Sequence, residues 1–165
     1  MKILILSDSH SSLGFMRSSI EKLQPDVIVH LGDHYDDGTV IAEENPRIRL
    51  YQVPGNCDRF LMSGWQPNIM CCSIGGLLCY MTHGHMHGVK SGESHLLSAA
   101  REAGAKIVMY GHTHEPVCRQ DGDLLVINPG SCRGYSGSVC LLEIDNNEIS
   151  SCRILRQEDI DETPI

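Results

Sequence analysis

The chain has 165 residues and a formal net charge of −8, and 41% of its residues are hydrophobic. This length predicts one compact domain that buries most of its apolar surface without disulfide bonds, and the composition excludes a disordered or fibrous chain. Lysine and arginine form no cluster, so we expect no polymeric nucleic acid as a partner. A small anionic substrate stays open, because bound cations can dominate the local field.

The start of the sequence predicts a cytoplasmic protein with no membrane partner. Its apolar run, residues 3–6, is far too short for a secretory signal or a membrane span. The eight cysteines are therefore expected to be thiols rather than a disulfide framework. No CxxC pair occurs among them, which argues against a zinc ribbon.

The first half of the chain alternates apolar runs with a helical pattern, which is typical of an α/β fold. Strands are predicted at residues 3–6, 27–31 and 48–53. After the first strand, and before a stop at Pro25, apolar residues recur at helical spacing at Phe15, Met16, Ile20 and Leu23. A short helix is expected between the second and third strands.

The second half of the chain indicates antiparallel hairpins. Pairs of predicted strands flank turn sequences at residues 69–74 and 77–81, 116–120 and 124–127, and 139–144 and 149–155. A helix over residues 93–103, with Gly104 just past its end, precedes a strand at 106–110. We therefore expect one α/β domain over residues 1–165, with mixed sheets packed on each other, helices outside, and a loose acidic tail at about 157–165.

Five predicted strands end in the same way, with glycine, histidine, asparagine or aspartate directly after the apolar run. The five endings are Ser7-Asp8-Ser9-His10, Gly32-Asp33, Pro54-Gly55-Asn56-Cys57-Asp58, Thr82-His83-Gly84-His85 and Gly111-His112-Thr113-His114. Open α/β sheets place ligands outside the carboxyl ends of their strands, and glycine allows tight turns there. In extended backbone, the i, i+2 spacing within the first and last endings directs both side chains to one side, where they can grip one ion.

These side chains are suited to a metal. Imidazole and carboxylate groups bind zinc, manganese, iron, cobalt or nickel. Seven candidates follow from the five endings: Asp8, His10, Asp33, Asn56, His83, His112 and His114. Seven ligands are too many for one tetrahedral structural zinc, and they suit two ions that share a carboxylate.

The motifs, in this order, resemble the signature of the calcineurin-like metallophosphoesterase superfamily, and its small single-domain phosphodiesterases most of all. They read Asp-x-His, Gly-Asp, Gly-Asn-x-Asp, His-Gly-His and Gly-His-x-His. They run from Asp8 to His114, and Asn128-Pro129-Gly130-Ser131 also looks like a loop of that group. Any one motif alone would be weak, but the ordered set is specific and covers nearly the whole chain.

The resemblance implies two mixed β-sheets packed face to face between outer helices, in four αββα layers. It also implies two divalent ions about 3.5–4 Å apart. Manganese is the expected metal, and nickel, zinc, iron or cobalt are alternatives. By the same resemblance, the first ion would be held by Asp8, His10 and His114, the second by Asn56, His83 and His112, and Asp33 would bridge them.

The activity that the resemblance implies is hydrolysis of small phosphate esters, with diesters favoured over monoesters. The ions would lower the pKa of a bridging water, and the resulting hydroxide would attack phosphorus in line with the leaving oxygen. Asn56 is a neutral ligand that, by analogy, would also contact the phosphate as part of the catalytic set.

One position departs from the larger superfamily. Many members carry a histidine after the asparagine of the Gly-Asn motif as a general acid, whereas this chain has Cys57, as small members often do. We hypothesise that His85 or solvent protonates the leaving group, so that good leaving groups are favoured. Cys57 is interpreted mainly as a small buried filler beside the ligands. Asp58 is interpreted as a residue that orients a ligand or caps a turn.

Simpler interpretations stay open for several residues. Asp8 and Asp33 could cap helices, and Asn56 could be only a turn residue. Arg133 could hold a phosphate group or be a solvated loop residue. The remaining histidines are interpreted as surface or core residues, at His30, His34, His87 and His95.

Two other classes of function compete with the enzyme. The superfamily includes a retromer-coat subunit that resembles these enzymes but acts as an interaction platform. Such a metal-binding scaffold can lose ligand histidines, whereas all seven positions are filled here. A metal-buffering or redox protein is disfavoured because the ligands sit at strand ends and no CxxC pair is present. A homo-oligomer stays open.

Overall fold

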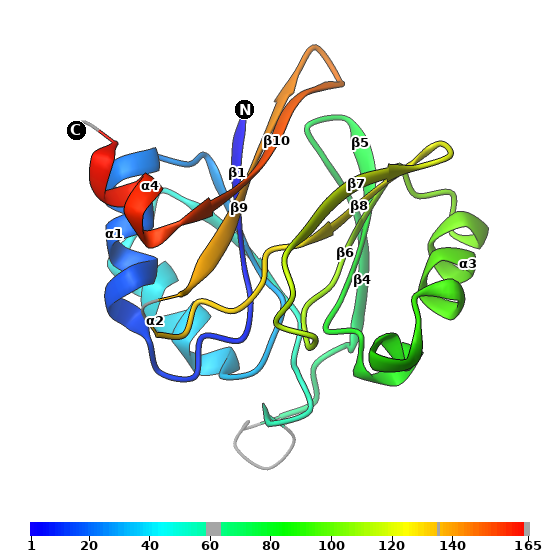
Figure 1. Ribbon diagram of the computed structural model, residues 1–165, viewed down its shortest axis with the longest axis horizontal. Helices are drawn as coiled ribbons and strands as arrows, with labels where there is room; N and C mark the ends of the chain where they lie inside the picture. The colour runs from blue at the N-terminus through cyan, green and yellow to red at the C-terminus, as the bar shows by residue number, and fades with distance from the viewer. Residues whose placement is uncertain (59–63, 135, 164–165) are drawn as a thin grey trace.

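A computed structural model describes residues 1–58, 64–134 and 136–163. Two mixed five-stranded sheets pack face to face, with helices on both outer sides (Figure 1). The molecule therefore has the four layers expected from the sequence, and the α/β sandwich is confirmed.

The first sheet contains three parallel strands and one hairpin, in the order β10-β9-β1-β2-β3. Its strands are β1 (Lys2–Leu6), β2 (Val27–His30), β3 (Arg49–Gln52), β9 (Ser138–Asp145) and β10 (Glu148–Arg156). In β1, Ile3 and Ile5 face the core between the sheets, while Leu4 and Leu6 face the helices. Burial on both faces explains why β1 is a continuous apolar run.

The second sheet has the order β4-β5-β6-β8-β7. Its strands are β4 (Ile69–Ile74), β5 (Leu77–Thr82), β6 (Ile107–Met109), β7 (Val117–Asp121) and β8 (Leu124–Asn128). Strands β5, β6 and β8 run parallel, and the three predicted hairpins pair as expected. The carboxyl ends of parallel strands in both sheets therefore lie at one edge of the sandwich.

The helices cover the outer faces of the two sheets. Helices α1 (Leu13–Leu23), α2 (Tyr35–Glu44) and α4 (Gln157–Glu162) lie beside the first sheet, and α3 (Ser94–Glu102) lies beside the second (Figure 1). The apolar residues that predicted α1 are its buried side, and the helix ends at Gln24, in left-handed backbone just before Pro25. Short 3₁₀ turns, η2 (His85–His87) and η3 (Val89–Ser91), follow β5.

The C-terminal segment differs from its prediction as a loose tail. Residues 157–162 form α4, and Ile160 is fully buried in the core between the helices and the first sheet. The Lys22 ammonium also donates a hydrogen bond to the Thr163 carbonyl at 2.9 Å. A single apolar side chain thus orders a segment whose acidic composition predicted disorder, while residues 164–165 lie outside the described residues.

The prediction of eight thiols is also wrong. Cys118 of β7 and Cys152 of β10 form a disulfide, with their Cα atoms 6.7 Å apart. The other six cysteines are free, and the Cys140 sulfur lies 3.6 Å from that of Cys152. Strands β7 and β10 are outer strands of different sheets, so their proximity follows from sheet packing and is invisible in the sequence spacing.

Among the described residues, no helix is long and apolar enough to cross a membrane.

Candidate metal centre

Two glycines allow the loops that carry Asp33 and Asn56 to meet. Gly32 has a φ of +95°, and a Cβ atom built there would collide with the backbone of Gly55. A Cβ atom on Gly55 would in turn collide with the carboxylate of Asp33. Only glycine permits this approach, which is why each loop places glycine directly before its candidate ligand.

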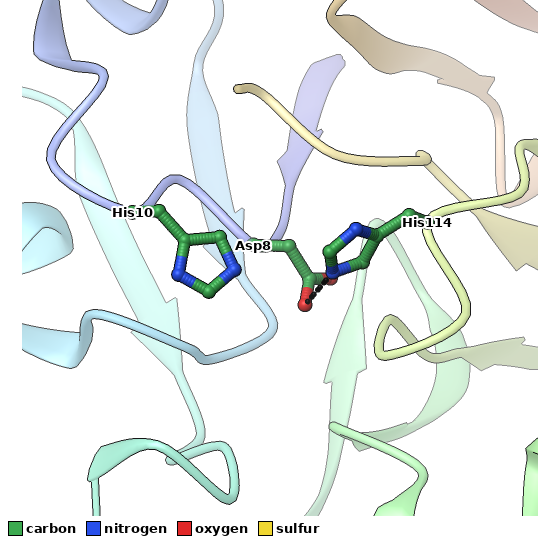
Figure 2. Close-up of side chains that lie close together, drawn as sticks. All are labelled: Asp8, His10 and His114. Atoms are coloured by element: carbon green, nitrogen blue, oxygen red, sulfur yellow. Dashed lines mark hydrogen bonds and ion pairs between the residues drawn. The ribbon is translucent and has the colours of Figure 1, made fainter. Parts of the chain in front are cut away.

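Asp8, His10 and His114 form the first cluster of candidate ligands. One potential ligand atom from each lies within 4.8 Å of the others. Figure 2 shows Asp8 between the two histidines, and Asp8 Oδ1 lies 3.1 Å from His114 Nε2. Asp8 and His10 come from the loop after β1, whereas His114 comes from the loop after β6, so two sheets contribute to this cluster.

A second cluster shares Asp8 with the first and adds Asp33 and His83. His83 Nε2 lies 3.5 Å from Asp33 Oδ1 and 3.9 Å from Asp8 Oδ1. It also lies 3.2 Å from Asn56 Oδ1, and the His83 and His112 ring centroids are 5.0 Å apart. The structure therefore brings all seven sequence-predicted candidates into one continuous group.

Neighbouring groups fix which atoms of His83 and Asp8 face the centre. The Leu31 carbonyl lies 2.7 Å from His83 Nδ1, so it accepts the Nδ1 proton and leaves Nε2 free as a ligand atom. Asp8 Oδ2 accepts hydrogen bonds from the Ser7 hydroxyl at 2.6 Å and the His112 backbone N–H at 3.0 Å. Oδ1 is thus the Asp8 oxygen that faces the histidines.

Asp58 supports the loops that carry Asp33 and Asn56. Its buried carboxylate accepts four backbone hydrogen bonds of 2.7–3.0 Å, from the N–H groups of Asp33, His34, Tyr35 and Gly55. Asp58 thus holds the backbone of the loop that carries Asp33, and its role in orienting a ligand stays a prediction. It also holds the start of α2, whose N-cap residue is His34, so Asp33 is not the helix cap. The N-cap of α1 is Ser12, which likewise excludes Asp8 from that role.

A buried polar network behind the first cluster was missed by the sequence interpretation. Asp37 accepts hydrogen bonds from the Ser9 hydroxyl at 2.7 Å and the Ser11 backbone N–H at 2.8 Å. His30 Nε2 lies 3.2 Å from the same Ser9 hydroxyl, and His30 Nδ1 accepts from the Gly32 N–H at 3.4 Å. These contacts brace the loop between Asp8 and α1, and no motif or spacing marks Asp37 for this role.

Five candidate ligands occupy left-handed backbone that L-residues rarely adopt: Asp8, His10, Asp33, His112 and His114, with φ from +44° to +69°. Such a conformation costs roughly 1–3 kcal/mol per residue and persists only where its surroundings enforce it. Five of the ten described non-glycine residues with positive φ are therefore predicted ligands, and the extended backbone expected for the pairs Asp8/His10 and His112/His114 is wrong.

A family model described as the calcineurin-like phosphoesterase superfamily domain matches residues 1–147. The chain belongs to this superfamily. A protein named phosphodiesterase MJ0936, from Methanocaldococcus jannaschii, is 32% identical over 162 residues, which cover 90% of this chain and 94% of that protein. The probable metallophosphoesterase YsnB of Bacillus subtilis is 30% identical over 136 residues, covering 81% of this chain and 76% of that protein.

Solved structures agree with this superfamily assignment. A predicted phosphoesterase from Streptococcus pneumoniae has a TM-score of 0.75 and 26% identity, and the match covers 95% of this chain and 90% of that one. Vps29 from Entamoeba histolytica, solved with Zn²⁺, has a TM-score of 0.73 at 21% identity, covering 94% and 98% of the two chains. At that identity the likeness to Vps29 shows the shared fold.

The electrostatics of this superfamily member favour neutral histidines beside an ionised carboxylate. Burial lowers the pKa of His10, and burial together with His83 and Lys90 lowers the pKa of His112 to about 4. Burial opposes ionisation of Asp33, but a hydrogen bond from the Cys57 N–H at 2.9 Å and the nearby His83 bring its pKa below the usual value. Neutral imidazoles and ionised carboxylates are the forms that bind metals, so the donor set fits divalent ions.

The remaining predicted residues lie around the second cluster. The His85 ring centroid is 5.4 Å from that of His83 and 6.1 Å from that of His112. Asn56 and Cys57 are exposed, so the interpretation of Cys57 as a buried filler is wrong. The backbone N–H of Cys57 donates to Asp33 Oδ1 at 2.9 Å, and its thiol also lies near the Asp33 carboxylate. Partial burial, followed by the neighbouring Asp33 carboxylate, raises the pKa of the Cys57 thiol to about 11.

Proposed function

We propose that this protein is a dinuclear metal-dependent phosphoesterase that cleaves small phosphodiesters in preference to monoesters. One observation carries the proposal: seven donor groups from five strand-end loops, the carboxylates of Asp8 and Asp33 among them, lie together in a chain of the calcineurin-like phosphoesterase superfamily. The diester preference is supported by relatives that are named phosphodiesterases. Fold likeness alone would not support an activity, but a complete donor set does.

The donor positions divide between two ions as the superfamily motifs imply. Asp8, His10 and His114 would hold one ion, and Asn56, His83 and His112 would hold the other. Asp33 would be shared, since its Oδ1 atom is 3.5 Å from His83 Nε2 and its carboxylate belongs to the same cluster as Asp8. When bound, such ions supply a nucleophile at neutral pH and withdraw charge from phosphoryl oxygens.

The chain's own groups position these ligands and the substrate. The Leu31 carbonyl and the Asp58 carboxylate hold His83 and the Asp33 loop in place before any ligand binds. Asn56 is exposed, and its amide N–H, which contacts only the weak acceptor Cys57 Sγ at 3.5 Å among the described residues, would contact a phosphoryl oxygen from the solvent side. A positioned donor is most useful where charge develops in the transition state, so Asn56 combines ligation with substrate binding.

His85 is the proposed partner of the leaving group. It lies beside His83 and His112, on the side of the centre that Asn56 also lines. An alanine variant should lose more activity on esters with poor leaving groups than on those with good ones, because only poor leaving groups need a proton donor. Equal loss on a series of aryl phosphodiesters would exclude this role.

The proposal also names the metal, the substrate class and the cellular location. Manganese is the proposed metal, with nickel, zinc, iron or cobalt as alternatives that the same ligands accept. A small phosphate ester is the proposed substrate, and the cytoplasm is the proposed location. A homo-oligomer is compatible with the proposal.

A non-catalytic metal-binding scaffold is the competing function. It would use the same fold and could retain the same ligands, so only turnover separates the two. The decisive experiment measures bound metal and the hydrolysis of bis(p-nitrophenyl) phosphate and p-nitrophenyl phosphate with Mn²⁺, Ni²⁺ or Zn²⁺. Asp33→Asn and His83→Ala would remove central donors, while His95→Ala, at an exposed position on α3, is the matched control.

The enzyme predicts about two ions per chain and hydrolysis that falls at least about 100-fold in both site variants, since each removes a central metal contact. The diester should be cleaved faster than the monoester, and the His95 variant should match the wild type. Metal binding without cleavage of either ester would favour the scaffold.

A further inference from the structure

The segment after β8 is fixed to the backbone of the metal loop. The Ser131 hydroxyl donates a hydrogen bond of 2.8 Å to the Asp8 carbonyl and accepts one of 3.1 Å from the Arg133 N–H. The Cys132 N–H donates to the Ser7 carbonyl at 3.0 Å. Two residues of chain span at most about 7 Å, so the backbone of Arg133 lies close to the loop that carries Asp8.

Among the described residues, the Arg133 side chain stabilises the fold through no polar contact. It is exposed, and its guanidinium makes no hydrogen bond or ion pair with any residue that the structure describes. Two other arginines are paired with carboxylates, Arg17 with Glu44 and Arg119 with Glu93 and Asp121. In a chain with 21 acidic and 13 basic residues, an unpaired arginine beside a candidate phosphoesterase centre is available to an external anion.

The chemistry of guanidinium points to one class of anion. Its planar fork of N–H groups matches two oxygens of a phosphate group and stays charged at all physiological pH values. A phosphate monoester presents such paired oxygens and carries more charge than the diester that is cleaved. In the proposed function the two ions and Asn56 bind the scissile group, so Arg133 fits a phosphate at a different position on the substrate.

We propose that Arg133 is a specificity-determining residue that binds a second, remote phosphate group of a phosphodiester substrate. The inference rests on the proposed function and deepens it, because it assigns the substrate class: phosphodiesters that also carry a phosphate monoester. The contacts that fix the Arg133 backbone explain the preference, since they hold the base of this exposed side chain close to the loop that carries Asp8.

A matched pair of substrates tests this assignment. Thymidine 5′-(p-nitrophenyl phosphate) and its 3′-phosphorylated form share the same scissile bond and leaving group, and they differ only in the remote phosphate. The ratio of kcat/KM for the phosphorylated substrate to that for the plain substrate measures the recognition. Charge-assisted hydrogen bonds of this kind lead us to expect that this ratio falls about tenfold in Arg133→Gln. Arg133→Lys should retain part of the preference, because it keeps the charge and loses the fork.

Two further variants distinguish a direct contact between Arg133 and the remote phosphate from a general effect of positive charge near the centre. Lys90→Gln removes one positive charge near His112, on the other side of the centre, and Arg47→Gln removes one from the distant connection between α2 and β3. If Arg133 contacts the remote phosphate directly, both variants should keep the wild-type ratio of the two kcat/KM values. That ratio should also fall less at raised salt than a long-range electrostatic effect, which salt screens, would fall. An equal fall in Lys90→Gln and Arg133→Gln would overturn the assignment.

A binding measurement keeps this test independent of turnover. Isothermal titration would compare thymidine 3′,5′-bisphosphate with thymidine 5′-monophosphate on the Mn²⁺-loaded protein. The wild type should bind the bisphosphate more tightly, and Arg133→Gln should lose about tenfold of that difference. Equal affinities in the wild type, or an unchanged difference in the variant, would overturn the role of Arg133. Absence of hydrolysis with the binding difference intact would instead contradict the proposed function.

Discussion

The buried and exposed donors of the candidate centre differ in how they are held. The side chains of Asp8 and His83 have no solvent exposure, and each has a hydrogen bond on the side away from the centre. The side chain of His114 is 47% exposed, and it lies 3.1 Å from Asp8 Oδ1 through its Nε2 atom. The buried donors are therefore part of the folded core as well as candidate ligands, whereas an exposed donor such as His114 faces solvent, from where a substrate would approach.

The largest effect should come from the support of the buried side. Asp58→Ala would leave four backbone N–H groups without their acceptor, and we expect it to lower the free energy of unfolding by about 3–5 kcal/mol. Asn56→Ala, two residues earlier but exposed, should cost less than about 1 kcal/mol. Urea denaturation of the metal-free proteins measures both values. Similar losses of unfolding free energy in the two variants would contradict the proposed difference between the buried supporting residue and the exposed candidate ligand.

The second prediction uses pH to probe the buried network behind Asp8. Burial lowers the pKa of His30 to about 4, below the value of about 6.5 in an unfolded chain. Between these values the unfolded state binds more protons, so the stability that neutral His30 provides is complete above pH 6.5 and is lost as the pH falls toward 4. The total loss should be about 3 kcal/mol.

His30→Gln supplies the reference for this pH effect, because the carboxylates titrate in both proteins. The difference in unfolding free energy between the wild type and this variant should shrink as the pH falls from 7 to 4. A difference that stays constant over this range would show that His30 is not held in its neutral form.

The third prediction compares two histidine donors directly. His83→Ala would leave the buried Leu31 carbonyl without its donor and open a cavity, costing about 2 kcal/mol in the metal-free protein. His114→Ala should change stability by less than about 0.5 kcal/mol, because that side chain is half exposed. Thermal unfolding would give both values, while metal titration should show weakened binding in each variant. A large loss of stability in His114→Ala would break the comparison.

Much of the fold could be predicted because its strands are strongly patterned. Continuous apolar runs such as residues 3–6 and turn pairs such as Gly75-Gly76 gave the strands and hairpins within a few residues of their observed ends. Helix α4 was not predicted because its packing depends on one buried isoleucine, Ile160, within an acidic segment. The Cys118–Cys152 disulfide was not predicted because it joins strands of two different sheets, 34 residues apart in sequence.

The candidate ligands could be predicted equally well, because each follows a strand whose carboxyl end reaches the same edge of the sandwich. The groups that hold these ligands in place could not be predicted. Asp37, the Leu31 carbonyl and the Ser131 hydroxyl contact residues 26 to 123 positions away, and common residue types at such separations leave no local signal. Left-handed backbone at histidine and aspartate is likewise imposed by tertiary contacts rather than by local propensity.

The central claim is that two ions share one set of donors, and electron paramagnetic resonance of the Mn²⁺-loaded protein tests it most directly. With two equivalents of Mn²⁺, a shared carboxylate at Asp33 should give the spectrum of an exchange-coupled pair. In Asp33→Asn this coupled signal should weaken or disappear. A spectrum of isolated Mn²⁺ ions in the wild type, with no coupling at any loading, would contradict a dinuclear centre.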